Sequence, residues 1–276
     1  MSARPAGAGP SLASGLRRDP RLSADSRGVG GRARGLRGTE RLTVPRGLGA
    51  GVSALREIDG IVRRRHLLRH PFYRAWSEGR LDRAILRDYA QQYYWFESNF
   101  PRYVAATYAR LEDAADRREL LENLVDEEGR SPTHPELWLD FLASVGGPTR
   151  REEIAAPRAA TRRLLGTYER EAFAPSAARG LGVLYAYERQ FPEVAAEKSR
   201  GLREFYGIRS RRAHEFFRVH VEADVAHSAS ERALLGRVVR GSAAAQREAR
   251  AAVTAGLDGW WRFLDAFTPA ASMGAR

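Results

Sequence analysis

Three residues of metal-ligand type lie close together in the stretch HVEADVAH. His220, Asp224 and His227 are spaced i, i+4 and i+7, and a helix turning by about 100° per residue places all three within an arc of roughly 60°. Two imidazoles and one carboxylate suit a first-row transition metal that keeps open coordination positions. One helix cannot complete such a site, so other segments have to supply the remaining ligands.

Further ligand-type residues lie upstream, in the stretches DEEGRSPTH and YAYERQFPE. Glu127, His134 and Glu188 bring the set to three carboxylates and three imidazoles. Helical bundles hold dinuclear iron or manganese with donors of this kind, and three carboxylates nearly balance two divalent cations. A single ion would use only half of the set. The sequence therefore favours a dinuclear centre over the ordinary explanation of histidines that are merely structural or exposed.

Lysine is almost absent from this chain. Of the 46 basic residues, Lys198 is the one lysine and the others are arginines. Arginine stays protonated, whereas a desolvated lysine loses its proton and can act as a base or an amine nucleophile. A role that arginine cannot fill would explain this residue, and chance survival explains it equally well from composition alone.

The formal net charge of +12 is unevenly distributed. Residues 1 to 50 contain ten arginines and three acidic residues, a net charge of +7, and the rest of the chain carries +5. This segment is rich in Gly, Ala, Ser and Arg without apolar periodicity, which predicts a disordered leader over 1–50 and one domain over 51–276. An RNA-binding tail or a transit segment has a similar composition. We expect a dispensable extension and no nucleic-acid partner.

Cysteine is absent from the chain, which excludes disulfides, thiolate metal sites, iron–sulfur clusters and cysteine nucleophiles. An uninterrupted apolar stretch of about 18 residues is also missing, and the N-terminus has no apolar signal core. We therefore expect a cytoplasmic protein without a membrane contact.

From about residue 52 onward the apolar pattern is helical, with breaks at Gly and Pro, which predicts an all-α fold. The expected helices cover residues 54–68, 71–78, 83–108 with a kink at Pro101, 115–128, 135–145, 157–172, 176–196, 197–206, 209–228 and 229–269, the last interrupted near Gly241. Glu97 and Glu188 each begin a Glu-x-x-Phe-Pro motif within these helices. We expect Glu97 to lie in an ordinary kinked core helix.

Five stretches carry a family resemblance that spans about residues 55 to 268. HPFYRAWSEGRL, DYAQQYYWFESNFPRYV, ENLVDEEGRSPTHPELW, YAYERQFPEVAAEKSRGL and HVEADVAH resemble, in order and spacing, the heme-oxygenase-like diiron oxidases. Within them the chain is most similar to the p-aminobenzoate synthases of the branch that contains the chlamydial death-domain-associating protein. The resemblance implies a bundle of about seven main helices around two iron ions, or one iron and one manganese, and it carries all six donors named above as ligands.

The same resemblance implies an unusual chemistry that consumes the protein. In the branch, a tyrosine of the protein supplies the aromatic ring and a lysine is implicated as the amine donor, with dioxygen and an external reductant as co-substrates. The matching residues here are Tyr73 and Lys198, and Tyr89 matches a second active-site tyrosine. We expect Tyr187, beside Glu188, to serve packing. The family leans toward dimers, so we expect a homodimer.

Two alternative functions follow from the same residues. A diiron oxidase or N-oxygenase acting on an external substrate would need the metal ligands but neither Tyr73 nor Lys198. An interaction protein with a vestigial metal site would need none of them. Pyrroloquinoline quinone synthases work without a metal, and thiaminase-like relatives use a cysteine nucleophile, which this chain lacks. The p-aminobenzoate synthase is therefore the principal hypothesis.

Overall fold

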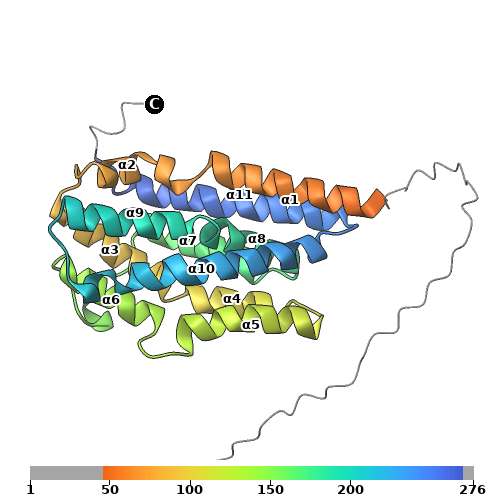
Figure 1. Cartoon of the computed structure of the whole chain (residues 1–276), viewed down its shortest axis with the longest axis horizontal. Coiled ribbons are helices and arrows are strands. Elements are labelled where there is room, and N and C mark those ends of the chain that lie inside the picture. Colours follow the sequence, from red (N-terminus) through yellow and green to blue (C-terminus); the bar gives the residue numbers. More distant parts are fainter. Residues whose placement is uncertain (1–45, 270–276) are drawn as a thin grey trace, which may run out of the picture. The chain divides into compact units, whose positions relative to one another are not determined.

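The computed structural model describes residues 46 to 269 (Figure 1). Residues 1 to 45 of the expected leader lie outside the described residues, and a helix already begins at Arg46, five residues before the expected start of the domain. The helices are α1 (Arg46–Arg64), α2 (Pro71–Ser77), α3 (Arg83–Glu97), α4 (Phe100–Tyr108), α5 (Ala114–Glu128), α6 (His134–Ser144), α7 (Ala159–Ala172), α8 (Ala177–Glu188), α9 (Phe191–Glu204), α10 (Arg211–Val238) and α11 (Ala243–Asp265). Short 3-10 helices cover Leu67–Arg69 and Arg151–Glu153. The described part of the chain has no strand, which confirms the all-α prediction.

Both Glu-x-x-Phe-Pro motifs divide a helix in two. Glu97 is the last residue of α3 and Glu188 the last of α8, while α4 and α9 begin three residues later at the phenylalanine. Proline takes an early position of each new helix, where its missing N–H is not needed. The expected helix over 176–196 is therefore wrong, and the kink expected at Pro101 is a full break. Each break leaves a glutamate at a helix end.

The helix that carries the HVEADVAH stretch is longer than predicted. The expected boundary between residues 228 and 229 does not exist, because α10 continues to Val238; no Gly or Pro lies at residues 228 to 235, and Gly236 is within the last turn of the helix. The expected interruption near Gly241 is confirmed. Gly241 has a φ of 74°, and the Ser242 side chain accepts a hydrogen bond from the Ala245 amide at 3.1 Å, which starts α11.

Helix α10 packs against α5, α6, α8 and α9, so it lies at the centre of the elements that carry the expected ligands (Figure 1). On the other side of α8 lies α11, and the two helices approach closely. A Cβ atom at Gly182 would lie 2.9 Å from the Ala249 carbonyl oxygen, so only glycine permits this contact. Helix α8 is thus held between α10 and α11, which fixes Glu188 at its end.

A search of the described helices for a membrane span found none with the length and hydropathy that crossing a bilayer requires.

Candidate metal centre

The ligand face of α10 points into the protein. His220, Asp224 and His227 are buried, whereas Val221 and Val225 on the same helix are 36% and 60% exposed. This is the reverse of an ordinary amphipathic helix, in which apolar residues face the core. Burying a row of polar side chains while exposing valines is costly unless the polar groups bind something. The polarity of α10 therefore indicates a site.

One group of four donors lies at the meeting point of α3, α5, α6 and α10. Each of the four can place one ligand atom within 4.8 Å of those of the others. The His134 Nδ1 atom lies 3.0 Å from Glu127 Oε2, and His220 Nε2 lies 3.8 Å from Glu97 Oε1. The His220 Nδ1 atom is 2.7 Å from the Phe216 carbonyl oxygen, so it donates there and Nε2 keeps its lone pair. We call Glu97, Glu127, His134 and His220 the first group.

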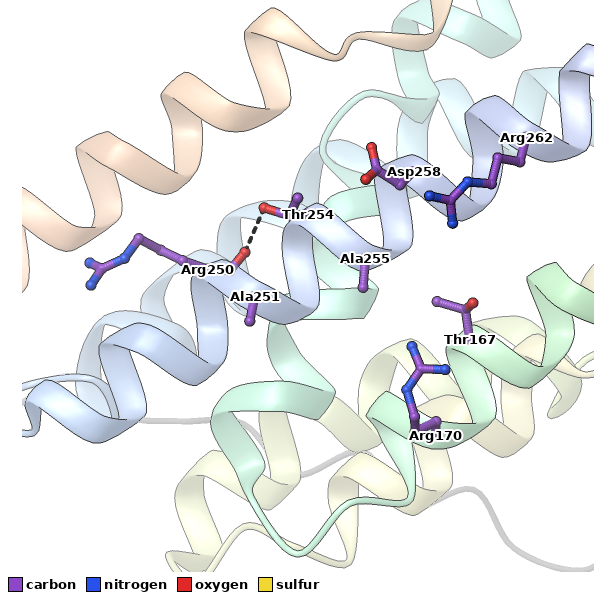
Figure 2. A pocket seen from close by; sticks show the side chains of 8 residues that line it. All are labelled: Thr167, Arg170, Arg250, Ala251, Thr254, Ala255, Asp258 and Arg262. Atoms are coloured by element: carbon purple, nitrogen blue, oxygen red, sulfur yellow. Dashed lines mark hydrogen bonds between the residues drawn. The ribbon is translucent and has the colours of Figure 1, made fainter.

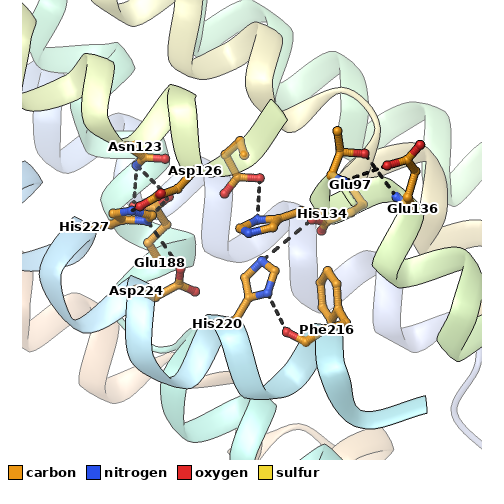
Figure 3. Close-up of polar contacts among 12 residues, drawn as sticks. Glu97, Asn123, Asp126, His134, Glu136, Glu188, Phe216, His220, Asp224 and His227 are labelled. Atoms are coloured by element: carbon orange, nitrogen blue, oxygen red, sulfur yellow. Dashed lines mark hydrogen bonds and ion pairs between the residues drawn. The ribbon is translucent and has the colours of Figure 1, made fainter. Parts of the chain in front are cut away.

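A second group lies beside it and shares one residue. Glu127, Glu188 and His227 also bring ligand atoms within 4.8 Å of one another. His227 Nδ1 lies 3.6 Å from Asp224 Oδ1 and 4.0 Å from Glu188 Oε1 (Figure 3). Because Glu127 belongs to both groups, its carboxylate is placed to bridge two ions, as in carboxylate-bridged dinuclear centres.

Unpaired polar atoms show that these residues fit a metal. Among the described residues, both carboxylate oxygens of Asp224 and the Nδ1 atom of His227 are buried without a hydrogen-bond partner. A buried polar atom left unpaired costs about 1–3 kcal/mol, and such atoms are rare in native proteins. Imidazole nitrogens and carboxylate oxygens are donors that iron and manganese accept. The set therefore fits a pair of such ions.

Electrostatics support the same conclusion. Burial, together with the charges of Glu188 and Glu127, raises the pKa of Asp224 to about 8. Burial likewise raises the pKa of Glu188. For His220, burial together with the charge of His134 holds the pKa well below 6.5, which keeps the imidazole neutral. Buried carboxylates need a positive charge to stay ionised, and a divalent cation supplies it.

Neighbouring side chains orient the ligands. The Asn123 Nδ2 atom donates to both oxygens of Glu188, at 2.9 and 3.1 Å. Asp126 accepts from His227 Nε2 at 3.1 Å, which turns Nδ1 toward the second group (Figure 3). Partners of this kind fix the tautomer and direction of a ligand. The sequence analysis did not find Asn123 or Asp126, although Asn123 lies four residues before Glu127 on the same face of α5.

The structure thus brings together most of the predicted donors and adds one. Glu127, His134, Glu188, His220 and His227 fall into the two groups, and Asp224 contacts His227. Glu97, expected to be an ordinary core residue, lies in the first group instead. Glu231, one turn beyond His227 on α10, was also missed; it is fully buried, and within the described part of the chain neither of its carboxylate oxygens accepts a hydrogen bond from an N–H group.

The lone lysine lies in a cage of aromatic rings. Lys198 is fully buried on α9, and its amine has no hydrogen-bond partner among the described residues. Burial lowers its pKa well below 10.5, against the opposing charge of Glu97, which favours the neutral amine. Six rings have centroids 4.3 to 5.9 Å from Nζ: Tyr73, Tyr89, Tyr93, Trp138, Phe191 and Phe217.

Close packing of α2 against α9 brings the two predicted reagents together. The Trp76 indole donates to the Lys198 carbonyl at 3.2 Å, and a Cβ atom at Gly201 would lie 2.7 Å from that indole. Tyr73 lies on the same short helix as Trp76, and its hydroxyl oxygen is 2.9 Å from that of Tyr89. Tyr73, Tyr89 and Lys198 are therefore neighbours in the core.

Comparison with known proteins assigns the chain to a family. A family model of iron-containing redox enzymes matches residues 87 to 261. The chain belongs to this family of iron-containing redox enzymes. The redox enzyme is 40% identical to the 4-aminobenzoate synthase of Chlamydia pneumoniae over 216 residues, which cover 76% of this chain and 92% of that protein. It is 37% identical to the 4-aminobenzoate synthase of Nitrosomonas europaea over 218 residues, covering 76% and 88% of the two chains.

A solved structure shares the fold. The CADD-like protein of Nostoc punctiforme superposes on this redox enzyme with a TM-score of 0.66 and 18% sequence identity, covering 80% of this chain and 97% of the other. At this identity the likeness shows the fold alone. It confirms the expected all-α, heme-oxygenase-like bundle.

A surface cavity of about 530 Å³ lies elsewhere on the redox enzyme, between α7 and α11 (Figure 2). Its polar lining consists of threonines, three arginines and Asp258, and none of the expected site residues contributes to it. We therefore place the chemistry at the buried centre and not in this cavity.

Proposed function

We propose that this redox enzyme makes 4-aminobenzoate, that is p-aminobenzoate, from its own Tyr73 and Lys198. Two iron ions, or one iron and one manganese, serve as cofactor in this proposal, with dioxygen and an external reductant as co-substrates. The names of the relatives at 37% to 40% identity support the product. The self-consuming chemistry follows from the resemblance of the motifs that contain the two residues.

The observation that carries the proposal is the position of the lysine amine. Lys198 is the one lysine of the chain, and it lies in the core against the rings of Tyr73 and Tyr89, at 5.6 and 5.4 Å. A buried, unpaired, neutral amine costs stability and carries a reactive lone pair. A purely structural role gains nothing from it, since an apolar side chain would pack as well there.

The residues around the centre have distinct roles in this proposal. Glu97, Glu127, His134 and His220 would hold one ion, and Glu127, Glu188, Asp224 and His227 the other. When bound, the ions supply the one-electron chemistry and open positions that dioxygen activation requires. Tyr89 fixes the Tyr73 ring through the hydroxyl pair and exchanges a proton with it. Glu97 acts electrostatically on both the lysine and Tyr89, which links the aromatic cage to the first group.

Burial argues against an external aromatic substrate. Tyr73 and Lys198 are 1% and 0% exposed, so a free substrate reaches neither side chain without opening of the core. A reagent that is part of the chain needs no entry path. An interaction protein with a vestigial metal site is disfavoured because the donors are still assembled.

Isotope labelling of the lone lysine tests the proposal directly. Protein grown with ε-15N-lysine carries the label at position 198 alone, and it is given ferrous iron, a reductant and oxygen without added substrate. We expect labelled 4-aminobenzoate, at no more than one equivalent per chain, by mass spectrometry. Unlabelled product would exclude Lys198 as the donor. Oxygen consumption without product would favour an oxidase that acts on an external substrate.

Further expectations belong to the same proposal. The enzyme is a cytoplasmic homodimer that serves folate biosynthesis, it has no nucleic-acid partner, and two iron ions, or one iron and one manganese, occupy the two positions. Metal analysis of protein purified with each ion tests the metal content, and light scattering tests the oligomeric state.

A further inference from the structure

A small cavity leads from the surface toward the second group of donors. It has a volume of about 130 Å³ and is lined by residues of α5 and α10 only. Four carboxylates contribute to the lining, from Glu119, Glu122, Asp126 and Glu231, and neither lysine nor arginine does. This volume has room for several water molecules. A partly hydrated ion therefore fits.

The cavity runs from an exposed rim to a buried floor. At the rim, Glu122 is exposed and Glu119 is half-buried. Asn123, His227 and Glu231 on the floor are 2%, 6% and 0% exposed. His227 is also a donor of the second group. The floor of the cavity is thus one wall of the candidate metal centre.

The floor holds oxygen atoms without partners. Both carboxylate oxygens of Glu231 and the Oδ1 atom of Asn123 are buried without a hydrogen-bond donor among the described residues. Glu188 interacts directly with Glu231, and the carboxylates of Asp224 and Glu127 act on it electrostatically as well. Carboxylates packed this closely are stable only where a proton or a cation lies between or beside them.

Two of the carboxylates that line the cavity form ion pairs, whereas Glu231 does not. Glu119 pairs with Arg237 at 2.8 Å, and Asp126 pairs with Arg130 at 2.8 Å as well as with His227. These two carboxylates are therefore already neutralised in part. Glu231 has no such partner, and it lies one helical turn beyond the ligand His227.

We infer that this cavity is the loading port through which a divalent cation reaches the dinuclear centre, with Glu231 as the transit ligand that passes the ion to Glu188 and His227. The rim carboxylates raise the local concentration of the cation. Glu231 then replaces part of the water shell of the ion, and the ligands of the second group complete its coordination. This inference rests on the metal centre of the proposed function and not on the reaction that the centre performs.

The test measures the rate of iron uptake apart from activity. Metal-free protein is mixed anaerobically with ferrous iron, samples are quenched with a coloured chelator at intervals, and protein-held iron is followed to its final level. For Glu231→Gln we expect the rate constant to fall by about tenfold or more, within the range of electrostatic effects on association, with the same final iron content. Glu122→Gln, at the exposed rim, should slow uptake by a smaller factor, and its effect should disappear at high salt.

A matched control is Glu222→Gln, which removes the same charge from α10 at an exposed position paired with Arg218 and outside the cavity lining. It should load like the wild type. Wild-type rates in both Glu231→Gln and Glu122→Gln would overturn the port. A lower final iron content at an unchanged rate in Glu231→Gln would make Glu231 a permanent ligand instead and would also overturn it.

Two results separate this inference from the proposed function. If the wild type holds no iron at the end point, the metal centre itself fails. If the wild type loads iron and releases product while both Glu231→Gln and Glu122→Gln load at the wild-type rate, only the port fails. Should Glu231→Gln not fold, the double variant Glu119→Gln/Glu122→Gln decides the question from the exposed rim.

Discussion

The hydroxyl oxygens of Tyr73 and Tyr89 lie 2.9 Å apart in the core, so each phenol has the other as its hydrogen-bond partner. Burial raises the pKa of Tyr73 and of Tyr89 far above 10, so both phenols are neutral at physiological pH. Removing one hydroxyl leaves the other without this partner. The Tyr73 ring then loses the contact that fixes its direction.

Tyr89→Phe therefore tests whether this pair matters for the chemistry. We expect a folded protein that is less stable by about 1 kcal/mol and that releases much less 4-aminobenzoate. Urea denaturation measures the first effect and mass spectrometry the second. Wild-type product from this variant would reduce Tyr89 to a packing residue.

Lys198→Met is expected to stabilise the protein and to abolish product. Methionine fills a similar volume among the six rings without a polar atom, and replacing a buried ionisable group in this way gains about 1–4 kcal/mol at best. The free energy of unfolding is measured at pH 7 and pH 10. Because burial lowers the folded pKa of Lys198, the unfolded chain binds an extra proton at pH 7, and the difference should shrink as pH rises toward 10.5. A Lys198→Met variant that is less stable than the wild type would contradict the conclusion that the buried amine is unpaired and destabilises the fold.

Glu97→Gln should weaken binding of one of the two ions. The variant removes a charge from the first group while leaving Glu188, Asp224 and His227 in place. We expect the affinity for one ion to fall by about 10-fold or more, which corresponds to about 1.4 kcal/mol. Titration of metal-free protein with manganese measures it. The control is Glu128→Gln, an exposed neighbour of Glu127; equal affinities in both variants would remove Glu97 from the centre.

His220→Ala should lower the metal content and the thermal stability gained on metal addition. Ions that bind only the folded state stabilise it by a free energy that rises with the logarithm of their affinity. Elemental analysis and melting curves with and without metal provide the readout. His214→Ala is the comparison, since His214 bonds Ser199 and the Ile208 carbonyl away from the donors and should change the melting temperature but not the metal content.

Asp59 ties three helices together and should control stability in acid. It accepts hydrogen bonds from Tyr185 at 2.7 Å and Arg232 at 2.8 Å. Burial alone would raise its pKa, but these bonds outweigh burial and lower it below 3.8. Asp59→Asn should cost about 1.5–3 kcal/mol at pH 7. The wild type loses this advantage as pH falls through the lowered pKa, so the urea midpoints of the two proteins should converge in acid, once the pH lies below that pKa.

The ligand pattern was readable from the sequence because a helix converts i, i+4 and i+7 spacing into one face. His220, Asp224 and His227 needed no tertiary information. Glu97 could be placed only with tertiary information, because its position beside His220 depends on where α3 ends and how α3 packs on α10. The Glu-x-x-Phe-Pro motif was visible, but sequence alone does not show that both glutamates end a helix at the same centre.

The direction of the α10 face could not be predicted from hydropathy. Apolar neighbours such as Val221 and Val225 favour a buried apolar face, yet these valines are exposed and the polar residues face inward. A local pattern fixes which residues share a face, but the partner helices decide which face is covered. The predicted ends of two helices were also wrong. Helix α8 ends at Glu188 because Pro192 takes an early position of a new helix, and α10 continues past residue 228 to Val238 because no Gly or Pro lies at residues 228 to 235.

Tyr73 and Lys198 are buried parts of the polypeptide itself, so the proposed reaction can occur only once in each chain. The Tyr73 ring is part of the packed core, so removing its atoms leaves a cavity, and a cavity of this kind lowers stability by several kcal/mol. The spent chain should unfold sooner and be cleared by proteases faster than the fresh one. Each chain then yields at most one molecule of product, so the rate at which new chains are translated limits the supply.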